Sequence, residues 1–214
     1  MRLGIIGGTF DPIHYGHLFI AEEARARFQL NHVAFIPNGQ PPHKNGAVVS
    51  PARHRYAMTQ TAVAGNPNFI CSPIEMQRPG LSYTVDTLTT LKEMYPDAEL
   101  FYITGVDAIA QILTWKRHEE VFRLATFLAA TRPGFDLLSL KDALPQDYLA
   151  RVLLIGSTYL GISSTDIRDR VRQNLPARYL TPDSVLNYIY KNQLYKAGGA
   201  EIVSIPEEKP EKNA

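Results

Sequence analysis

The sequence has a single cysteine, no long apolar run and no excess of either charge. Cys71 cannot form a disulfide within the chain, and one thiol is too few for a zinc site built on cysteines, so we expect a small core residue there. The 22 Lys+Arg and 21 Asp+Glu residues leave a formal net charge of +1. That balance argues against nucleic acid as a partner, because nucleic-acid binders carry a basic face. It remains compatible with a phosphate site, which needs only a few cations.

The apolar residues are too scattered for a membrane protein. No stretch approaches the roughly 18 apolar residues that cross a bilayer, and the apolar stretch near Met1 is too short for a signal peptide. We therefore expect a cytoplasmic protein with no membrane partner. Hydrophobic residues make up 45% of the 214 positions, which is too many for a disordered chain and enough for a buried core.

Short apolar runs alternate with amphipathic segments along the chain. The pattern predicts strands at residues 2–7, 32–36, 69–75, 99–104, 125–131 and 151–155. It predicts helices at residues 16–29, 52–64, 83–95, 163–173 and from 181 onward, and a long loop at 37–50. This alternation is typical of an α/β fold: a doubly wound, Rossmann-like parallel sheet with helices on both faces. We expect one domain over residues 1–195 and a flexible tail without catalytic residues over 196–214.

The first functional motif runs from Gly7 through Gly8, Thr9 and Phe10 to His14 and His17, between the first strand and the first helix. In a doubly wound sheet this turn faces the ligand crevice. Glycines let the backbone approach a phosphate, and N–H groups at a helix start favour anions. The spacing of the two histidines aims both rings at one crevice, where they can stabilise a phosphoryl group under attack. A purely structural turn is the alternative, and no third ligand nearby supports a protein metal site.

A second motif lies at the expected start of a late helix. Ser163, Ser164 and Thr165 supply hydroxyls beside free N–H groups, and Arg168 follows within one helical turn. Such a helix start favours anions, and a guanidinium can make paired hydrogen bonds to phosphate oxygens. Helix capping by the serines, with Arg168 on a solvated face, explains the same residues without a ligand.

Five further residues carry a functional and a structural interpretation each. Lys44 follows a proline-stiffened loop and can reach a phosphate or solvent, and Arg132 at a strand end can meet a phosphate or a carboxylate. Trp115 can stack on a pyridine ring or pack in the core. Thr84 and Asp107 can cap helices, or serve a substrate carboxylate and a ribose hydroxyl. No pattern assigns a role to the two arginines beside the long loop, Arg53 and Arg55.

The two motifs together resemble the signatures of the nucleotidyltransferase superfamily. His14-Tyr15-Gly16-His17 is similar to its H-x-G-H signature, and the segment from Ile162 to Arg168 matches I-S-S-T-x-I-R position by position. Middle segments narrow the resemblance to the bacterial nicotinate mononucleotide adenylyltransferases, and it covers residues 1 to about 195. Those segments are residues 37–44, 82–88, 105–107, 115 and 132–134.

The resemblance implies transfer of the adenylyl group of ATP to nicotinate mononucleotide, giving nicotinate adenine dinucleotide and pyrophosphate for NAD biosynthesis. It implies in-line displacement with no covalent enzyme intermediate, and Mg²⁺ carried by ATP without a protein metal site. The implied catalytic residues are His14, His17, Lys44 and Arg168. The implied ATP-binding residues are Gly7, Gly8, Thr9, Phe10, His14, His17, Gly105, Asp107, Ser163, Ser164, Thr165 and Arg168. The implied mononucleotide-binding residues are Lys44, Thr84, Asp107, Trp115 and Arg132.

Three other functions stay open at this point. An NAD-dependent oxidoreductase would need a G-x-G-x-x-G turn, which the first motif lacks. A nucleotide-binding regulator without catalysis would be expected to have lost the histidines, which are intact. An enzyme preferring nicotinamide mononucleotide differs only in reading an amide in place of a carboxylate. A homo-oligomer is also left open, with the helical C-terminal part as the candidate interface.

Overall fold

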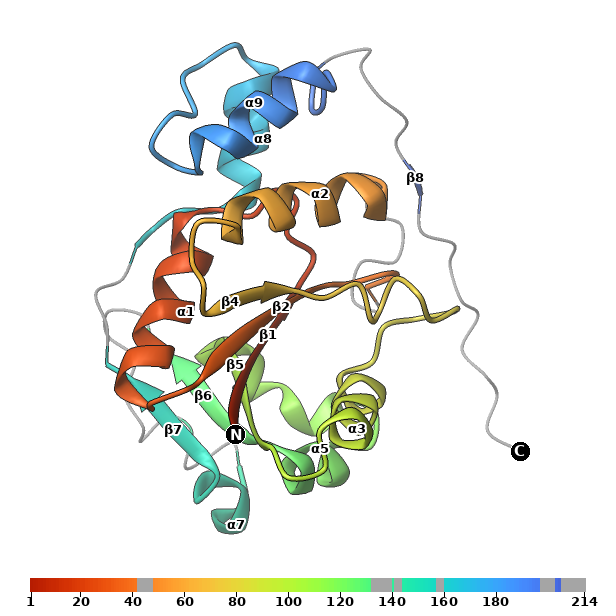
Figure 1. Cartoon of the computed structure of the whole chain (residues 1–214), viewed down its shortest axis with the longest axis vertical. Helices are drawn as coiled ribbons and strands as arrows, with labels where there is room; N and C mark the ends of the chain where they lie inside the picture. The colour runs from red at the N-terminus through yellow and green to blue at the C-terminus, as the bar shows by residue number, and fades with distance from the viewer. Residues whose placement is uncertain (42–47, 132–139, 141–143, 157–159, 197–202, 205–214) are drawn as a thin grey trace.

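The computed structural model describes residues 1–41, 48–131, 140, 144–156, 160–196 and 203–204. Its main sheet has six strands in the order β4-β2-β1-β5-β6-β7 (Figure 1). All neighbouring pairs are parallel, with Ile5 of β1 opposite Ala34 of β2. The strands are β1 (Arg2–Gly8), β2 (His32–Pro37), β4 (Phe69–Cys71), β5 (Glu99–Gly105), β6 (Thr126–Ala130) and β7 (Val152–Ile155). The expected doubly wound parallel sheet is confirmed.

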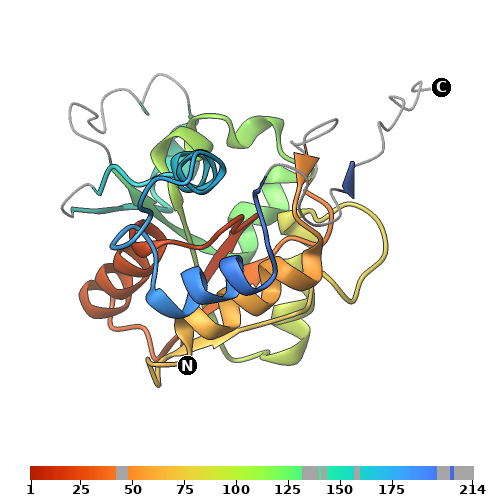
Figure 2. The ribbon, with the colours of Figure 1, turned by 90° about the horizontal axis from the view of Figure 1, so that it is seen from above.

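Helices connect the strands and form the C-terminal part of the described chain. They are α1 (Tyr15–Arg27), α2 (Ala52–Val63), α3 (Thr84–Met94), α4 (Val106–Ala110), α5 (His118–Leu124), α7 (Gln146–Leu149), α8 (Ser164–Arg172) and α9 (Asp183–Lys191). A 3₁₀ turn spans Ile112–Thr114. Helices α8 and α9 lie together at one end of the molecule, and α9 runs beside α2 in both views (Figures 1 and 2). None of the described helices is long and apolar enough to cross a bilayer.

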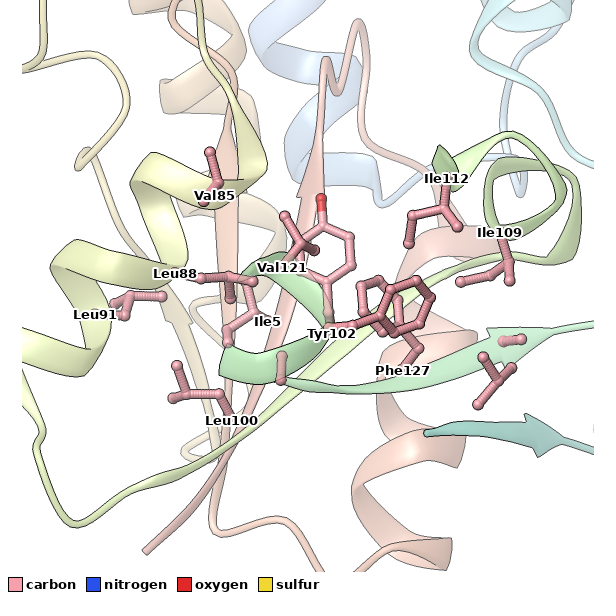
Figure 3. Close-up of a cluster of buried hydrophobic side chains, with 14 of the residues drawn as sticks. Ile5, Val85, Leu88, Leu91, Leu100, Tyr102, Ile109, Ile112, Val121 and Phe127 are labelled. Atoms are coloured by element: carbon pink, nitrogen blue, oxygen red, sulfur yellow. The ribbon is translucent and has the colours of Figure 1, made fainter. Parts of the chain in front are cut away.

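The central strands bury side chains on both faces of the sheet. Ile5 and Tyr102 belong to the cluster that Figure 3 shows, with side chains of α3, α4 and α5 packed around them. Their neighbours along the strands, Ile6 and Ile103, belong to a second cluster with α1, α2, α8 and α9. Successive residues of a strand point to opposite faces, so a strand buried on both sides is apolar nearly throughout. Helices therefore cover both faces, as expected.

Several element boundaries differ from the sequence expectation. Strand β4 ends at Cys71, well before residue 75, because Pro73 cannot donate to a ladder. Helix α2 begins at Ala52 as expected, with Pro51 as its capping residue, and the Ser50 N–H donates to Asp11.

Two residues expected as helix caps lie inside their helices, and two short helices were not predicted. Tyr83 precedes α3, which makes Thr84 its first helical residue, and Gly105 precedes α4, which places Asp107 inside that helix. Helices α5 and α7 are additional, and they are too short to show a clear helical period. Ser163 caps α8 as expected, because its hydroxyl accepts the N–H of Asp166.

A small second sheet involves the expected loop and the expected tail. Strand β3 (Val48–Val49) pairs antiparallel with β8 (Val203–Ser204). The structure thus places one part of the 196–214 segment beside the loop that follows β2.

The sheet contains one point where the strand order reverses. From β1 the chain first builds outward through β2 and β4, and it then crosses to β5, β6 and β7 on the other side. Helices leave the carboxyl ends of β1 and β5 on opposite faces there, which opens a crevice that binds ligands in sheets of this kind. Gly8 and Gly105 end these two strands.

Replacement of Phe127 by alanine tests the packing of the face shown in Figure 3. The Phe127 ring is fully buried on β6, with ring centroids 4.8 Å from Phe122 and 5.6 Å from Tyr102. The cavity should lower the free energy of unfolding by about 3 to 5 kcal/mol in urea titrations. Leu153→Ala, at a 40% exposed position on β7, is the control and should cost less than about 1 kcal/mol. Equal losses would contradict this packing.

Candidate active site

The turn after β1 brings His14 and His17 into direct contact. His14 is the extended capping residue of α1, and His17 lies in the first turn of that helix. Their rings stack with centroids 3.7 Å apart and an interplanar angle of 26°. The His14 backbone N–H donates to Nδ1 of His17 over 3.3 Å. An imidazole nitrogen that accepts carries no proton, so the proton of neutral His17 is on Nε2 and is available as a donor.

Both imidazoles are neutral at pH 7. Burial lowers the pKa of His14 to about 4. The pKa of His17 lies well below its usual value of 6.5, mainly because the ring is buried and to a smaller extent because of the charge of His14. The Nδ1 atom of His14 is buried without a hydrogen-bond partner among the described residues. A buried polar atom that lacks a partner lowers stability.

The Phe10 ring packs against one ring of the histidine pair, that of His17. Its backbone has φ 49°, in the left-handed region, and its ring is buried. The ring meets the His17 ring edge-on at 5.1 Å, and a Cβ on Gly8 would lie 3.1 Å from it. Phe10 was expected among the ATP-binding residues, and the structure places its side chain in the core beneath His17. The glycine leaves the space that the ring needs.

The C-terminal motif docks on this same turn through a row of hydrogen bonds. Three consecutive backbone carbonyl oxygens, those of residues 11–13, accept from three side chains. In order, the donors are Arg168 Nη1 (2.8 Å), Ser164 Oγ (2.8 Å) and Thr181 Oγ1 (2.7 Å). The two signatures recognised separately in the sequence therefore form one site. Arg168 Nη2 also donates to Thr165 Oγ1, which holds the guanidinium over the helix start.

A buried carboxylate holds the other side of the turn. Asp11 accepts the Ser50 N–H with Oδ2 (3.1 Å) and the Tyr195 hydroxyl with Oδ1 (2.7 Å). Burial, the larger cause, and the negative charge of Asp11, the smaller one, raise the pKa of Tyr195 well above its usual value. The phenol therefore stays protonated and donates. No pattern singled out Tyr195, whose link to Asp11 spans most of the sequence.

A buried arginine that sequence reasoning left without a role links three backbone segments. Arg55 is 2% exposed, and its guanidinium donates to the carbonyl oxygens of Thr9 (2.9 Å), Gly39 (3.1 Å) and Ser50 (2.9 Å). Burial lowers its pKa, and the negative charge of Asp11 opposes this change. A lone arginine on a helix gives no sequence signal for such a role, since it resembles any solvated residue.

A cavity of about 280 Å³ opens at the carboxyl ends of the strands, beside the turn. It brings together five residues expected from the sequence: Gly7, Gly8, Thr9, Thr84 and Trp115. Its further lining residues are Asn38, Pro41, Ser82, Tyr83, Tyr102, Thr104, Thr114 and Lys116. These additional residues come from the loop after β2, from the segment before α3, from β5 and from the 3₁₀ turn with the residues that follow it, and these segments meet only in the folded chain.

The wall of this cavity is aromatic. Trp115 is half-buried and meets the Tyr102 ring edge-on at 6.0 Å, while it also packs on the cluster beneath. Trp115 therefore both packs on the core and lines the cavity, and its stacking on a pyridine ring stays a prediction. Burial raises the pKa of Tyr102 to about 12, and its hydroxyl lies 3.5 Å from Thr84 Oγ1. A Cβ on Gly7 would lie 2.8 Å from that hydroxyl, so glycine is required at this wall.

The remaining expected site residues lie apart from the cavity or outside the described chain. Gly105 and Asp107 are exposed at the carboxyl end of β5, on the same edge of the sheet as the glycines of β1 but not in the cavity lining. Lys44 and Arg132 lie outside the described residues.

Acidic side chains of the described chain do not gather into a metal site. Among the residues described, no group of three His, Cys, Asp or Glu side chains is placed to hold an ion. Asp11, the carboxylate nearest the histidines in sequence, uses its two oxygens to accept from Ser50 and Tyr195.

Comparisons with known proteins agree on one family. The family model described as cytidylyltransferase-like matches residues 5–170. A probable nicotinate-nucleotide adenylyltransferase of Corynebacterium glutamicum is 48% identical over 94% of this chain and 91% of its own. A relative of the same name from Desulfitobacterium hafniense is 51% identical, over 91% of this chain and 96% of its own.

A solved structure shares the fold at low sequence identity. Nicotinic acid mononucleotide adenylyltransferase of Plasmodium falciparum, complexed with NaAD, aligns with a TM-score of 0.73 at 20% identity. The alignment covers 91% of this chain and 97% of that one. This likeness supports the sheet order and the placement of helices described above.

The lowered histidine pKa values make the stability of the protein pH-dependent. In the unfolded chain His14 titrates near 6.5, and in the folded chain its pKa is about 4. Between these values the unfolded state binds more protons, so acidification favours unfolding. Between pH 7 and 4 the wild type should lose about 3 kcal/mol more free energy of unfolding than His14→Gln, measured by urea titration. Parallel pH dependences of the two proteins would show that His14 is not buried as a neutral ring.

Proposed function

Because the chain belongs to the cytidylyltransferase-like family, and within it to the nicotinate-nucleotide adenylyltransferases, we propose that it transfers the adenylyl group of ATP to nicotinate mononucleotide. The products are nicotinate adenine dinucleotide and pyrophosphate, as NAD biosynthesis requires. One observation carries the proposal. The two phosphate-binding motifs meet on a single turn, next to a cavity with an aromatic wall.

The triphosphate of ATP binds over the turn between β1 and α1. His17 donates from Nε2 to a phosphate oxygen, and His14, stacked on it, supplies a second imidazole. Arg168 and the N–H groups at the start of α8 hold the leaving pyrophosphate, with Ser163, Ser164 and Thr165 beside it. We assign Gly105 and Asp107, at the end of the neighbouring strand, to the adenosine ribose.

The mononucleotide occupies the cavity. Trp115 lies against the pyridine ring, and Thr84 at the first turn of α3 receives the carboxylate, where helix N–H groups favour an anion. The amino end of α3 favours nicotinate over nicotinamide, because only nicotinate carries a negative charge on its ring substituent. Lys44 and Arg132 would serve the mononucleotide phosphate, as the family resemblance implies. Gly7, Gly8 and Thr9 form the floor between the two substrates.

The reaction needs positioning and charge stabilisation more than proton transfer. The 5′-phosphate of the mononucleotide is anionic near neutral pH, so it attacks the α-phosphorus without a general base. Donors fixed in place around that phosphorus stabilise the charge that develops during in-line displacement. Mg²⁺ bound to ATP would neutralise charge on the phosphates.

A pyrophosphate-release assay tests the assignment directly. Purified protein is incubated with Mg-ATP and, in turn, nicotinate mononucleotide, nicotinamide mononucleotide and phosphopantetheine. We expect the highest kcat/KM with nicotinate mononucleotide, and nicotinate adenine dinucleotide as the product by mass spectrometry. A preference for nicotinamide mononucleotide would change the assigned acceptor. Inactivity with all three would leave a nucleotide-binding regulator as the better description.

Replacement of His17 by alanine tests the phosphate donor. Loss of one fixed donor at the reacting phosphoryl group should lower kcat by about 100-fold or more, with a smaller change in KM. The matched control is His32→Ala, at the amino end of β2 and thus at the opposite edge of the sheet, which should retain wild-type turnover. A folded His17→Ala enzyme with kcat within tenfold of wild type would remove His17 from the mechanism.

A further inference from the structure

One buried carboxylate beside the cavity has no part in the mechanism above. Glu75 follows β4 and is only 4% exposed. Its Oε1 accepts from the Thr87 hydroxyl (2.7 Å) and its Oε2 from Asn38 Nδ2 (2.8 Å), and the Ser82 side chain also bonds to it. Burial raises the pKa of Glu75, while these three donors oppose the rise because they bind the ionised form. Burial of a carboxylate has a desolvation cost, which hydrogen bonds from aligned donors offset. The carboxylate in turn fixes the orientation of the side chains that donate to it.

The Asn38 side chain is what Glu75 orders on the cavity side. An amide has one NH₂ end, which donates, and one oxygen, which accepts. The NH₂ end of Asn38 faces Glu75, because Nδ2 donates to Oε2, and the reverse orientation would bring two oxygens together. Asn38 lines the cavity. With its NH₂ end bound to Glu75, its Oδ1 is the end left for a ligand.

Glu75 also orders the backbone next to Asn38. The Ser82 oxygen accepts the N–H groups of Gly39 (3.0 Å) and Gln40 (3.3 Å), so the hydroxyl hydrogen is left for Glu75. This segment lies directly on the chain around Glu75, since a Cβ on Gly39 would come within 2.5 Å of the Glu75 carbonyl oxygen. The amide of Asn38 is therefore fixed in both position and orientation.

The chemistry of the proposed acceptor decides what Oδ1 can meet. Nicotinate mononucleotide carries an anionic carboxylate and an anionic phosphate, which an acceptor oxygen repels. Its ribose hydroxyls are the groups that donate. We propose that Glu75 is a positioning residue, which holds Asn38 so that Oδ1 accepts a hydrogen bond from a ribose hydroxyl of the mononucleotide. This inference rests on the function proposed above.

Glu75→Gln is the central variant, because it keeps the shape but replaces the carboxylate with an amide that can present either its oxygen or its NH₂ group to Asn38. The Asn38 amide is then no longer held in one orientation. We expect KM for nicotinate mononucleotide to rise by up to about tenfold, the scale of one well-oriented hydrogen bond, with kcat and KM for ATP within about twofold of wild type. Thr87→Val is the matched control. It removes another hydrogen bond to the same carboxylate and leaves the bond to Asn38, so it should lower stability but not change KM.

A double-mutant cycle separates positioning from general damage. Asn38→Ala should raise KM for the mononucleotide at least as much as Glu75→Gln does, and the double variant should be no worse than Asn38→Ala alone. Additive effects, an equal rise in KM for ATP, or an unchanged KM in Asn38→Ala would overturn the inference. If Glu75→Gln does not fold, the Asn38→Ala result decides alone. A wild-type enzyme that makes no dinucleotide would overturn the proposed function as well, whereas an active wild type with an unaffected Asn38→Ala variant overturns this inference only.

Discussion

Hydrogen bonds between the C-terminal segment and three successive carbonyls of the turn at residues 11–13 hold the site together. A turn has no ladder or helix to satisfy its carbonyl groups, and a buried carbonyl without a donor costs about 1 to 3 kcal/mol. Arg168, Ser164 and Thr181 supply those donors. The same bonds fix the start of α8 beside the two histidines. Two of these donors, Arg168 and Ser164, are residues that we assign to the triphosphate, so the stability of the turn and the geometry of the proposed site rest on the same contacts.

The electrostatics of the histidine pair follow from its burial. His14 and His17 are neutral because burial lowers the pKa of each ring, and a neutral imidazole still offers one N–H donor. Arg168 and Arg55 add two guanidinium groups that bind the backbone carbonyl oxygens of the same turn. Positive charge is thus concentrated at this turn in a chain whose formal net charge is only +1.

Much of the fold could be predicted from the sequence because its central strands are apolar on both faces and alternate with longer amphipathic segments. The turn between β1 and α1 and the cap at Ser163 were predicted for the same reason, since their residues are close in sequence. The structural partners of the site were not predictable in that way. Arg55, Glu75 and Tyr195 act through residues far along the chain, and an isolated Arg, Glu or Tyr carries no local pattern that distinguishes a buried partner from a solvated side chain.

The segment at residues 38–40 shows why such buried charges matter for a site built largely on loops. Arg55 binds the carbonyl oxygen of Gly39 from one side, and Ser82, backed by Glu75, binds its N–H from the other. Neither a helix nor a paired strand fixes this backbone, so two ionised side chains do so through directional hydrogen bonds. Apolar packing alone would leave the amide of Asn38 free to reverse, because its two ends have nearly the same shape. A charge can specify which end faces a substrate, and this specificity is a reason for a protein to bury one despite the cost of desolvation.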